Sequence, residues 1–224
     1  MINKLTPRFE FRAFAYDFGV KRDRLHHLAT LEDIEERTDV YLLTPGNQSH
    51  NIKVRGNSLD IKYLLHKENN LELWLPLSQA TFPLTASQLH QELFTSLNII
   101  NPKLEYESYG QQAFWDILIK PQPSICLAHV VKHRFLFRYG SCRAEVSNLW
   151  LNGSPLQTLA IKDEDSEIVQ QVIKKLCLES YENVNYPLAI ERFMHLTPYF
   201  ITPHTWLSTG SGSSQFLKES HVNF

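Results

Sequence analysis

The chain has 224 residues, 43% of them hydrophobic and 21% charged, a balance that permits a packed core and argues against global disorder. Its formal net charge of −2 argues against a general nucleic-acid-binding protein, because such proteins carry a basic excess. No apolar run approaches the roughly 20 residues of a membrane helix, and the N-terminus has no apolar signal core. Three scattered cysteines fit buried thiols in a reducing compartment. We therefore expect a cytoplasmic protein.

The N-terminal half predicts several strands and one helix. RFEFRAFA alternates with period two, which places Arg8, Glu10 and Arg12 on one face of a strand. From Val20 to Arg37, apolar residues recur three apart among charges, which predicts an amphipathic helix. Further strands are predicted over 38–43, 50–55, 59–66 and 71–76, with Gly56-Asn57 as a hairpin turn between the second and third of them.

The C-terminal half predicts helices on either side of a group of strands. Thr85 opens a helix with Gln88 at the capping-box position, and Leu89, Leu93 and Leu97 form its buried face. Residues 103–120 show no clear period, and they would have to supply strands for a closed sheet. Strands are predicted over 132–140, 141–153 and 156–165, followed by a helix that begins after the acidic residues 163–165.

The last part of the chain has no clear pattern. The periodicity decays from Thr197, and STGSGSS is followed by a stretch without a regular period. We expect one domain over residues 1–200 and a loose tail over 201–224.

Charged residues recur two apart in strand after strand, with apolar residues between them. One interpretation is the solvated face of an antiparallel sheet. The other is a sheet closed around a polar interior, where unpaired cations would be costly unless an anionic ligand balanced them. Cations outnumber carboxylates in this set, which favours a polyanion as the ligand. The positions are Arg8, Glu10, Arg12, Lys53, Arg55, Asp60, Lys62, Lys132, Arg134, Arg143 and Glu145.

Several of these segments resemble the CYTH superfamily of triphosphate tunnel metalloenzymes, over roughly Arg8 to Ala189. They are RFEFR, NIKVR followed by LDIK, KHR, and the run from CRAEV to NVNYPLA. The hallmark of the family is an N-terminal ExExK strand. The resemblance implies an α+β fold, an antiparallel eight-stranded β-barrel with flanking helices, whose tunnel grips a triphosphate through a divalent metal.

The resemblance also implies roles for individual residues. Glu10 matches the second Glu of ExExK, and Glu145 matches an acidic tunnel residue. Both are implied as catalytic residues and as ligands of Mg²⁺ or Mn²⁺. The implied ligand-binding residues are Arg8, Arg12, Lys53, Arg55, Lys62, Lys132, Arg134 and Arg143.

Some positions depart from the family pattern. Arg8 stands in place of the first Glu of the hallmark, and Ala160 and Lys162 stand where the family has acidic residues. Loss of carboxylates and gain of cations should weaken a metal site.

Two functional hypotheses therefore stay open, and a third interpretation is a protein whose charged faces are merely solvated. One is a metal-dependent triphosphate phosphohydrolase, and the other is a non-catalytic module that binds a triphosphate-containing or polyanionic small molecule. Assembly as a homodimer is left open.

Overall fold

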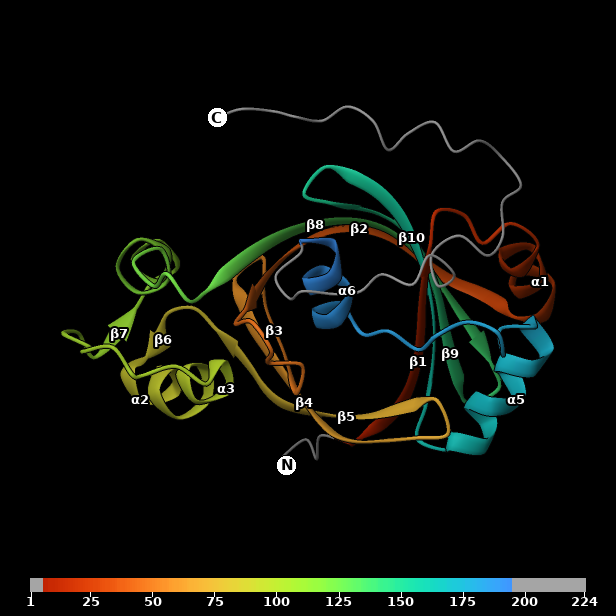
Figure 1. Ribbon diagram of the computed structural model, residues 1–224, viewed down its shortest axis with the longest axis horizontal. Coiled ribbons are helices and arrows are strands. Elements are labelled where there is room, and N and C mark those ends of the chain that lie inside the picture. The colour runs from red at the N-terminus through yellow and green to blue at the C-terminus, as the bar shows by residue number, and fades with distance from the viewer. Residues whose placement is uncertain (1–5, 195–224) are drawn as a thin grey trace.

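Eight antiparallel strands close into a barrel in the computed structural model, which describes residues 6–194 (Figure 1). Around the barrel the strands follow the order β1-β10-β9-β8-β2-β3-β4-β5, and β5 pairs with β1 to close the ring. The predicted α+β barrel with flanking helices is confirmed. The barrel strands are β1 (Arg8–Ala15), β2 (Thr30–Leu43), β3 (His50–Arg55), β4 (Ser58–Glu68), β5 (Leu71–Thr81), β8 (Cys126–Tyr139), β9 (Cys142–Leu151) and β10 (Ser154–Asp163).

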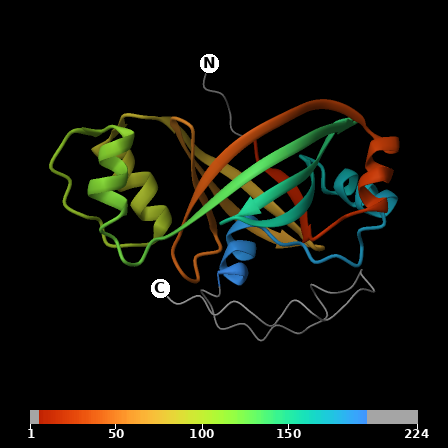
Figure 2. The same cartoon turned by 90° about the horizontal axis from the view of Figure 1, so that it is seen from above.

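Helices pack outside two opposite walls of the barrel (Figures 1 and 2). One wall carries α1 (Val20–Leu28) and α5 (Ser166–Leu176). The other carries an insert between β5 and β8, and α6 (Tyr186–Phe193) lies at one opening of the barrel. The insert comprises β6 (Leu84–Thr85), α2 (Ala86–Gln88), η1 (Leu89–Phe94), α3 (Thr95–Leu97), β7 (Ser108–Tyr109), α4 (Gln111–Ala113) and η2 (Phe114–Ile119).

The alternation of β1 divides its side chains between two environments. Phe11 and Ala13 point outward and are buried in a core with Leu25 of α1 and Val172 of α5. The charged residues between them point into the barrel. Asp165 caps the N-terminus of α5 by accepting a hydrogen bond from the backbone N–H of Glu167, which confirms the predicted helix start.

The insert forms a second core against the outer face of β3 and β4. Thr85 and Gln88 make the predicted capping box, and the three leucines that follow are fully buried. The expectation that residues 103–120 supply strands to a closed sheet is wrong. They form β7, α4 and η2, and the barrel closes without them.

The helix predicted over Val20–Arg37 is only half correct. It ends at Leu28, and β2 begins at Thr30 and pairs with β8 as far as Leu43. Leu31 and Ile34, expected on the buried face of a helix, are 41% and 50% exposed on that strand. Pairing along the length of β8 therefore overrides a local helical spacing.

The helix α6 fills one part of the barrel interior. Its Tyr186 and Ile190 pack against apolar side chains of β2, β8 and β9, which are Leu43, Ala128, Val130, Leu149 and Leu151. The fully buried carboxylate of Glu191 holds the helix to the β2–β3 loop by accepting hydrogen bonds from Gly46 N and Gln48 Nε2, each at 3.1 Å. The interior is therefore apolar where α6 packs and polar in the remainder.

The predicted boundary at residue 200 and the tail over 201–224 lie outside the described residues, so the division into domain and tail stays a prediction. In residues 6–194, no helix combines the length and the hydropathy needed to cross a bilayer.

Candidate functional site

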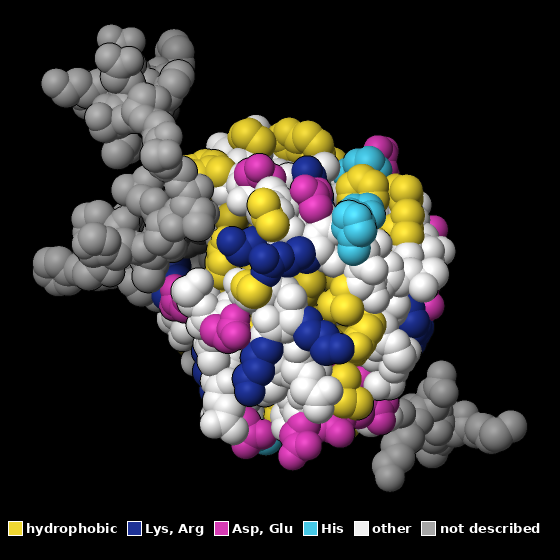
Figure 3. Space-filling model, turned by 90° about the vertical axis from the view of Figure 1, so that its right-hand side faces the viewer, with side chains coloured by type: hydrophobic (Ala, Val, Ile, Leu, Met, Phe, Trp, Pro, Cys, Tyr) yellow, Lys and Arg dark blue, Asp and Glu magenta, His cyan; other side chains and the backbone are white. Residues whose placement is uncertain are grey.

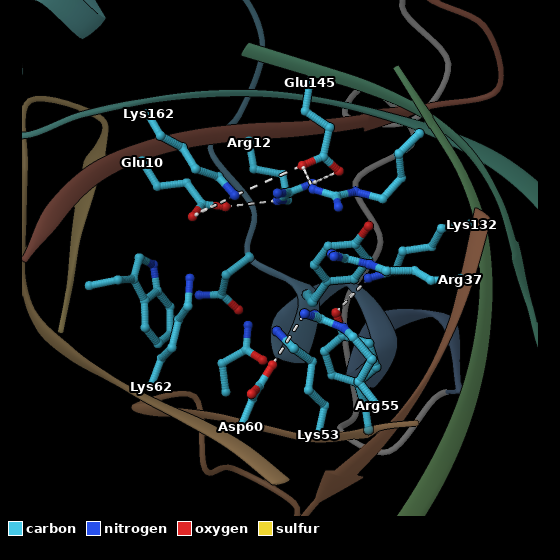
Figure 4. A pocket seen from close by; sticks show the side chains of 16 residues that line it. Glu10, Arg12, Arg37, Lys53, Arg55, Asp60, Lys62, Lys132, Glu145 and Lys162 are labelled. Carbon is cyan, nitrogen blue, oxygen red and sulfur yellow. Dashed lines mark hydrogen bonds and ion pairs between the residues drawn. The ribbon is translucent and has the colours of Figure 1, made fainter. Parts of the chain in front are cut away.

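The polar part of the barrel encloses a cavity of about 200 Å³. Eight of its lining side chains are cationic and three are acidic, and they come from β1, β2, β3, β4, β8, β9 and β10 (Figure 4). The cations are Arg12, Arg37, Lys53, Arg55, Lys62, Lys132, Arg134 and Lys162, and the carboxylates are Glu10, Asp60 and Glu145.

On one wall of the cavity, cations link two carboxylates into a network. Arg12 donates through Nε to Glu10 Oε1 at 2.9 Å, and its Nη1 lies 3.8 Å from Glu145 Oε1. Lys162 Nζ lies 3.4 Å from Glu10 Oε2 and 4.0 Å from Glu145 Oε2. Arg134 donates to Glu145 Oε2 at 2.6 Å. Glu10, Arg12, Glu145 and Lys162 gather on one side of Figure 4. Each of the two carboxylates contacts at least two cations.

The network sets the ionisation of its members. Burial by itself would raise the pKa of Glu10, but Lys162 and Arg12 outweigh it and hold that pKa at about 2. Burial would likewise raise the pKa of Glu145, which Arg12 and Lys162 hold well below its ordinary value. Burial lowers the pKa of Lys162 to about 8, although Glu10 opposes the change. Both carboxylates are therefore ionised at neutral pH.

Asp39 organises the cations of the adjoining wall. It has no solvent exposure, and it accepts hydrogen bonds from Arg55 Nε at 2.7 Å and from Lys132 Nζ at 2.6 Å. Lys132 also donates to the hydroxyl of Tyr41 at 2.9 Å and lies 3.8 Å from the ring centre of Tyr186. Asp39 thus fixes two of the cations in place without itself lining the cavity.

Lys53 and Lys62 are different, because among the described residues neither has a salt-bridge partner. Both extend into the cavity from β3 and β4, on the side opposite the Glu10–Glu145 network (Figure 4). Lys53 is only 7% exposed. Burial and then the neighbouring Lys62 lower its pKa well below the ordinary lysine value. A buried lysine without a partner costs free energy, and an anion in the cavity would remove that cost.

Buried polar atoms that lack a hydrogen-bond partner also gather here. Within residues 6–194, five side-chain atoms are buried and unsatisfied, and all five residues line this cavity. In a folded protein, such atoms are normally satisfied by protein, water or ligand. The atoms are Arg37 Nε, Asn51 Oδ1, Asp60 Oδ1, Arg134 Nε and the Tyr186 hydroxyl oxygen.

Eight of the residues predicted from the sequence meet in this cavity, and two do not. The eight are Glu10, Arg12, Lys53, Arg55, Lys62, Lys132, Arg134 and Glu145. Arg8 is not among the lining residues, and its partly exposed side chain lies 3.9 Å from Glu164. Arg143 is exposed and does not line the cavity either. The structure thus gives Arg8 and Arg143 no place in the cavity, and the roles of the other eight stay predictions.

The sequence analysis missed Arg37 as a site residue because it placed this position at the end of a helix. The signal was present, since Glu35, Arg37, Asp39 and Tyr41 alternate with period two on β2. Tyr186 lay in a segment that resembled the family, but no single-residue pattern marks a side chain that enters the barrel from a helix. Lys162 was recognised only as a departure, and the structure places it among the lining residues.

The donor set does not fit the Mg²⁺ or Mn²⁺ ion that the family resemblance implies. Mg²⁺ requires nearly octahedral oxygen donors at short distances, whereas Glu10 and Glu145 are both held by Arg12 and Lys162. At an effective dielectric constant near 20, a doubly charged ion about 4 Å from one ammonium group meets a repulsion of about 8 kcal/mol. In the part of the chain that the structure describes, no three His, Cys, Asp or Glu side chains gather as a metal site.

Comparison with known proteins shows a likeness of fold. No family model matches the chain, and no curated protein does. A conserved hypothetical protein from Pyrococcus furiosus is similar over 80% of this chain and 98% of its own, at 18% identity and a TM-score of 0.46. A mimivirus capping enzyme triphosphatase covers 79% of this chain and 89% of its own, at 11% identity and a TM-score of 0.44.

A third protein of similar structure is a candidate adenylyl cyclase from Hippeastrum, described as having a dominant triphosphatase activity. It is similar over 85% of this chain and 98% of its own, at 11% identity and a TM-score of 0.47. These likenesses concern the fold alone. The chemistry of this tunnel depends on its own side chains.

Proposed function

We propose that the cavity binds a small phosphate-rich anion of the triphosphate type. The observation that carries the proposal is the position of the unsatisfied groups. Within residues 6–194, every buried side-chain N or O atom without a hydrogen-bond partner belongs to a residue lining the cationic cavity. A polyphosphate offers several negatively charged acceptor oxygens in a small volume. It would therefore balance the excess cations and accept from three of the five atoms, Arg37 Nε, Arg134 Nε and the Tyr186 hydroxyl. The other two, Asn51 Oδ1 and Asp60 Oδ1, are acceptors and need a donor such as water.

The proposed ligand position lies between the two walls of the cavity. Within residues 6–194, Lys53 and Lys62 have no salt-bridge partner, so their ammonium groups are available to an anion. Arg37 and Arg134 each keep an unsatisfied Nε–H group beside the same space. Arginine and lysine together provide bidentate and point-charge recognition of phosphate oxygens. The acidic network around Glu10 leaves the Lys53–Lys62 side as the more favourable one for the phosphates.

A binding role is favoured over metal-dependent phosphate hydrolysis. Enzymatic phosphoryl transfer relies on metal ions or equivalent cations that neutralise the developing charge, and on a group that orients the nucleophile. Glu10 and Glu145 are the carboxylates in the predicted catalytic position, and each is engaged by at least two cations. A metal-dependent hydrolase remains the alternative that the experiment must distinguish.

A thermal-shift titration with sodium tripolyphosphate, with phosphate release measured in the same wells, tests the proposal. Binding only to the folded state stabilises it by about 2.7 kcal/mol at a hundredfold excess over Kd. In a domain of this size that corresponds to a rise in Tm of roughly 5–10 °C. We expect this shift in the presence of a chelator and no phosphate release. The absence of a shift with and without Mg²⁺ or Mn²⁺ contradicts the proposal, and metal-dependent release establishes the hydrolase instead.

A further inference from the structure

The ammonium group of Lys162 lies between two carboxylates that the family resemblance implies as metal ligands. Its Nζ is 3.4 Å from Glu10 Oε2 and 4.0 Å from Glu145 Oε2. Figure 4 shows Lys162 directed to these two carboxylates on one side of the cavity. The strand register fixes this position, because Lys162 on β10 is directly opposite Glu10 on β1. The side chain thus lies where a cation shared by the two carboxylates would lie.

The surroundings of Lys162 favour a resident ammonium over an exchangeable ion. The side chain is about three-quarters buried, and the carboxylates that it contacts are 14% and 6% exposed. Ala160, two residues earlier on β10, is directly opposite Glu145 on β9 and has no oxygen to offer. Because a covalently attached ammonium group need not be captured from solution, Lys162 offsets part of the carboxylate charge without that cost.

We propose that Lys162 is a built-in replacement for a divalent cation, which makes anion binding in this cavity independent of metal. Together with Arg12, the ammonium group offsets the charge of Glu10 and Glu145 without an ion from solution, so that these carboxylates do not repel an incoming polyphosphate. The inference rests on the proposed function for its ligand, but it also makes a prediction about metal binding alone. A divalent ion should have no affinity for the native protein, and removal of the lysine should create such affinity.

Lys162→Glu is the decisive variant, because it removes the resident cation and adds a third carboxylate beside Glu10 and Glu145. Mn²⁺ alone is titrated into each protein, and binding is followed by the loss of the free-ion EPR signal. We expect no saturable binding by the native protein and an affinity at least about tenfold higher in the variant, since ligand charge governs the affinity of such sites. Lys174→Glu, on the exposed face of α5, is the charge-matched control and should behave as the native protein does.

Sodium tripolyphosphate provides the second readout, measured by calorimetry with EDTA or with Mn²⁺. The native protein should bind equally well in both conditions. Lys162→Glu should lose about tenfold or more in affinity with EDTA and regain it with Mn²⁺, because a single charge-assisted contact carries about that much. Lys162→Gln removes the charge without adding a carboxylate. It should bind Mn²⁺ more tightly than the native protein does. If Lys162→Glu does not fold, this variant tests whether Lys162 takes the place of a divalent cation.

Three results overturn the inference. The first is saturable Mn²⁺ binding by the native protein, and the second is native tripolyphosphate binding that requires Mn²⁺. The third is a failure of the folded variants to gain affinity for Mn²⁺. A native protein that binds no tripolyphosphate in either condition contradicts the proposed function instead, and the Mn²⁺ titration still decides the role of Lys162.

Discussion

The buried lysine Lys53 suits the proposed anion-binding cavity but lowers the stability of the ligand-free fold. The residue is 7% exposed, and among the described residues it has no salt-bridge partner. Burial and Lys62 lower its pKa well below the ordinary value, so the charged form is disfavoured in the ligand-free protein. A residue that served only to hold the barrel together would not be retained in this state, because an apolar side chain of similar size would stabilise the fold better.

Lys53→Met should therefore separate stability from binding. We expect the ligand-free variant to be more stable by about 1 kcal/mol, because an unpaired buried amine is replaced by an apolar side chain. We also expect its affinity for tripolyphosphate to fall by about tenfold or more, because a charge-assisted contact is lost. Urea unfolding gives the first quantity and calorimetric titration the second.

The matched control is Arg143→Gln, which changes an exposed cation outside the cavity. Its effect on either quantity should stay within about twofold in affinity and 0.5 kcal/mol in stability. If Lys53→Met lost stability and kept its affinity, Lys53 would be a structural residue.

Glu10 has the opposite relation to stability, because its charged form is favoured by the fold. Lys162 and Arg12 hold its pKa at about 2 against an ordinary value of 4.5. A carboxyl with a lowered folded-state pKa contributes stability above its unfolded-state pKa and loses it as the pH falls toward the folded-state value. The contribution of Glu10 is therefore present at neutral pH and is lost between about pH 5 and pH 2.

Glu10→Gln should flatten this acid dependence. Because one pKa unit corresponds to about 1.4 kcal/mol, the native protein and the variant should differ by about 3 kcal/mol at pH 7 and converge near pH 2. Urea unfolding at a series of pH values measures both curves. Glu179→Gln, an exposed change on the connection after α5, should leave the native curve unaltered. Parallel curves for the native protein and Glu10→Gln would show that the Arg12–Lys162 network does not favour the ionised carboxyl.

At the scale of the elements, strands in which apolar and charged residues alternate were predictable from the sequence. The pairing of strands that are far apart in the sequence was not. In β1, β3 and β9, apolar and charged residues alternate because one face packs on a core and the other faces the cavity. The first half of β2 has both faces largely exposed, so no alternation marks it. Leu31 and Ile34 continue the spacing of the preceding helix, and only the register with β8 shows that the helix ends at Leu28.

The candidate site was predictable to the extent that its residues lie on alternating strands. Eight of the ten predicted residues line the cavity, whereas Arg8 and Arg143 share the alternation without lining it. The alternation of residues with period two indicates on which face of the strand a side chain lies, but not its position along the barrel. The contribution of Tyr186 depends on α6 packing into the barrel, and that contact joins residues far apart in sequence. These parts of the site follow from the tertiary structure alone.

At the scale of the whole molecule, cations are concentrated in the cavity, whereas the rest of the chain has more acidic than basic residues. Of the 22 basic and 24 acidic residues, eight and three line the cavity, which leaves 14 basic against 21 acidic residues elsewhere in the chain. On the face that carries α1 and α5, lysines and arginines form small groups among acidic and uncharged side chains (Figure 3). Such a distribution attracts a small anion that can enter the barrel and offers little to a long polyanion that must stay on the surface.

The protein should therefore discriminate between polyanions by size. We expect tripolyphosphate to bind, and a fluorescently labelled RNA of about 20 nucleotides with a 5′-hydroxyl end to bind more weakly than about 10⁻⁴ M at physiological salt. Fluorescence anisotropy measures the RNA, and excess unlabelled tripolyphosphate serves as the competitor. RNA binding in the micromolar range would contradict the prediction. If tripolyphosphate then displaced the RNA, the cavity mouth would be the contact, and if it did not, a basic surface outside the cavity would be responsible.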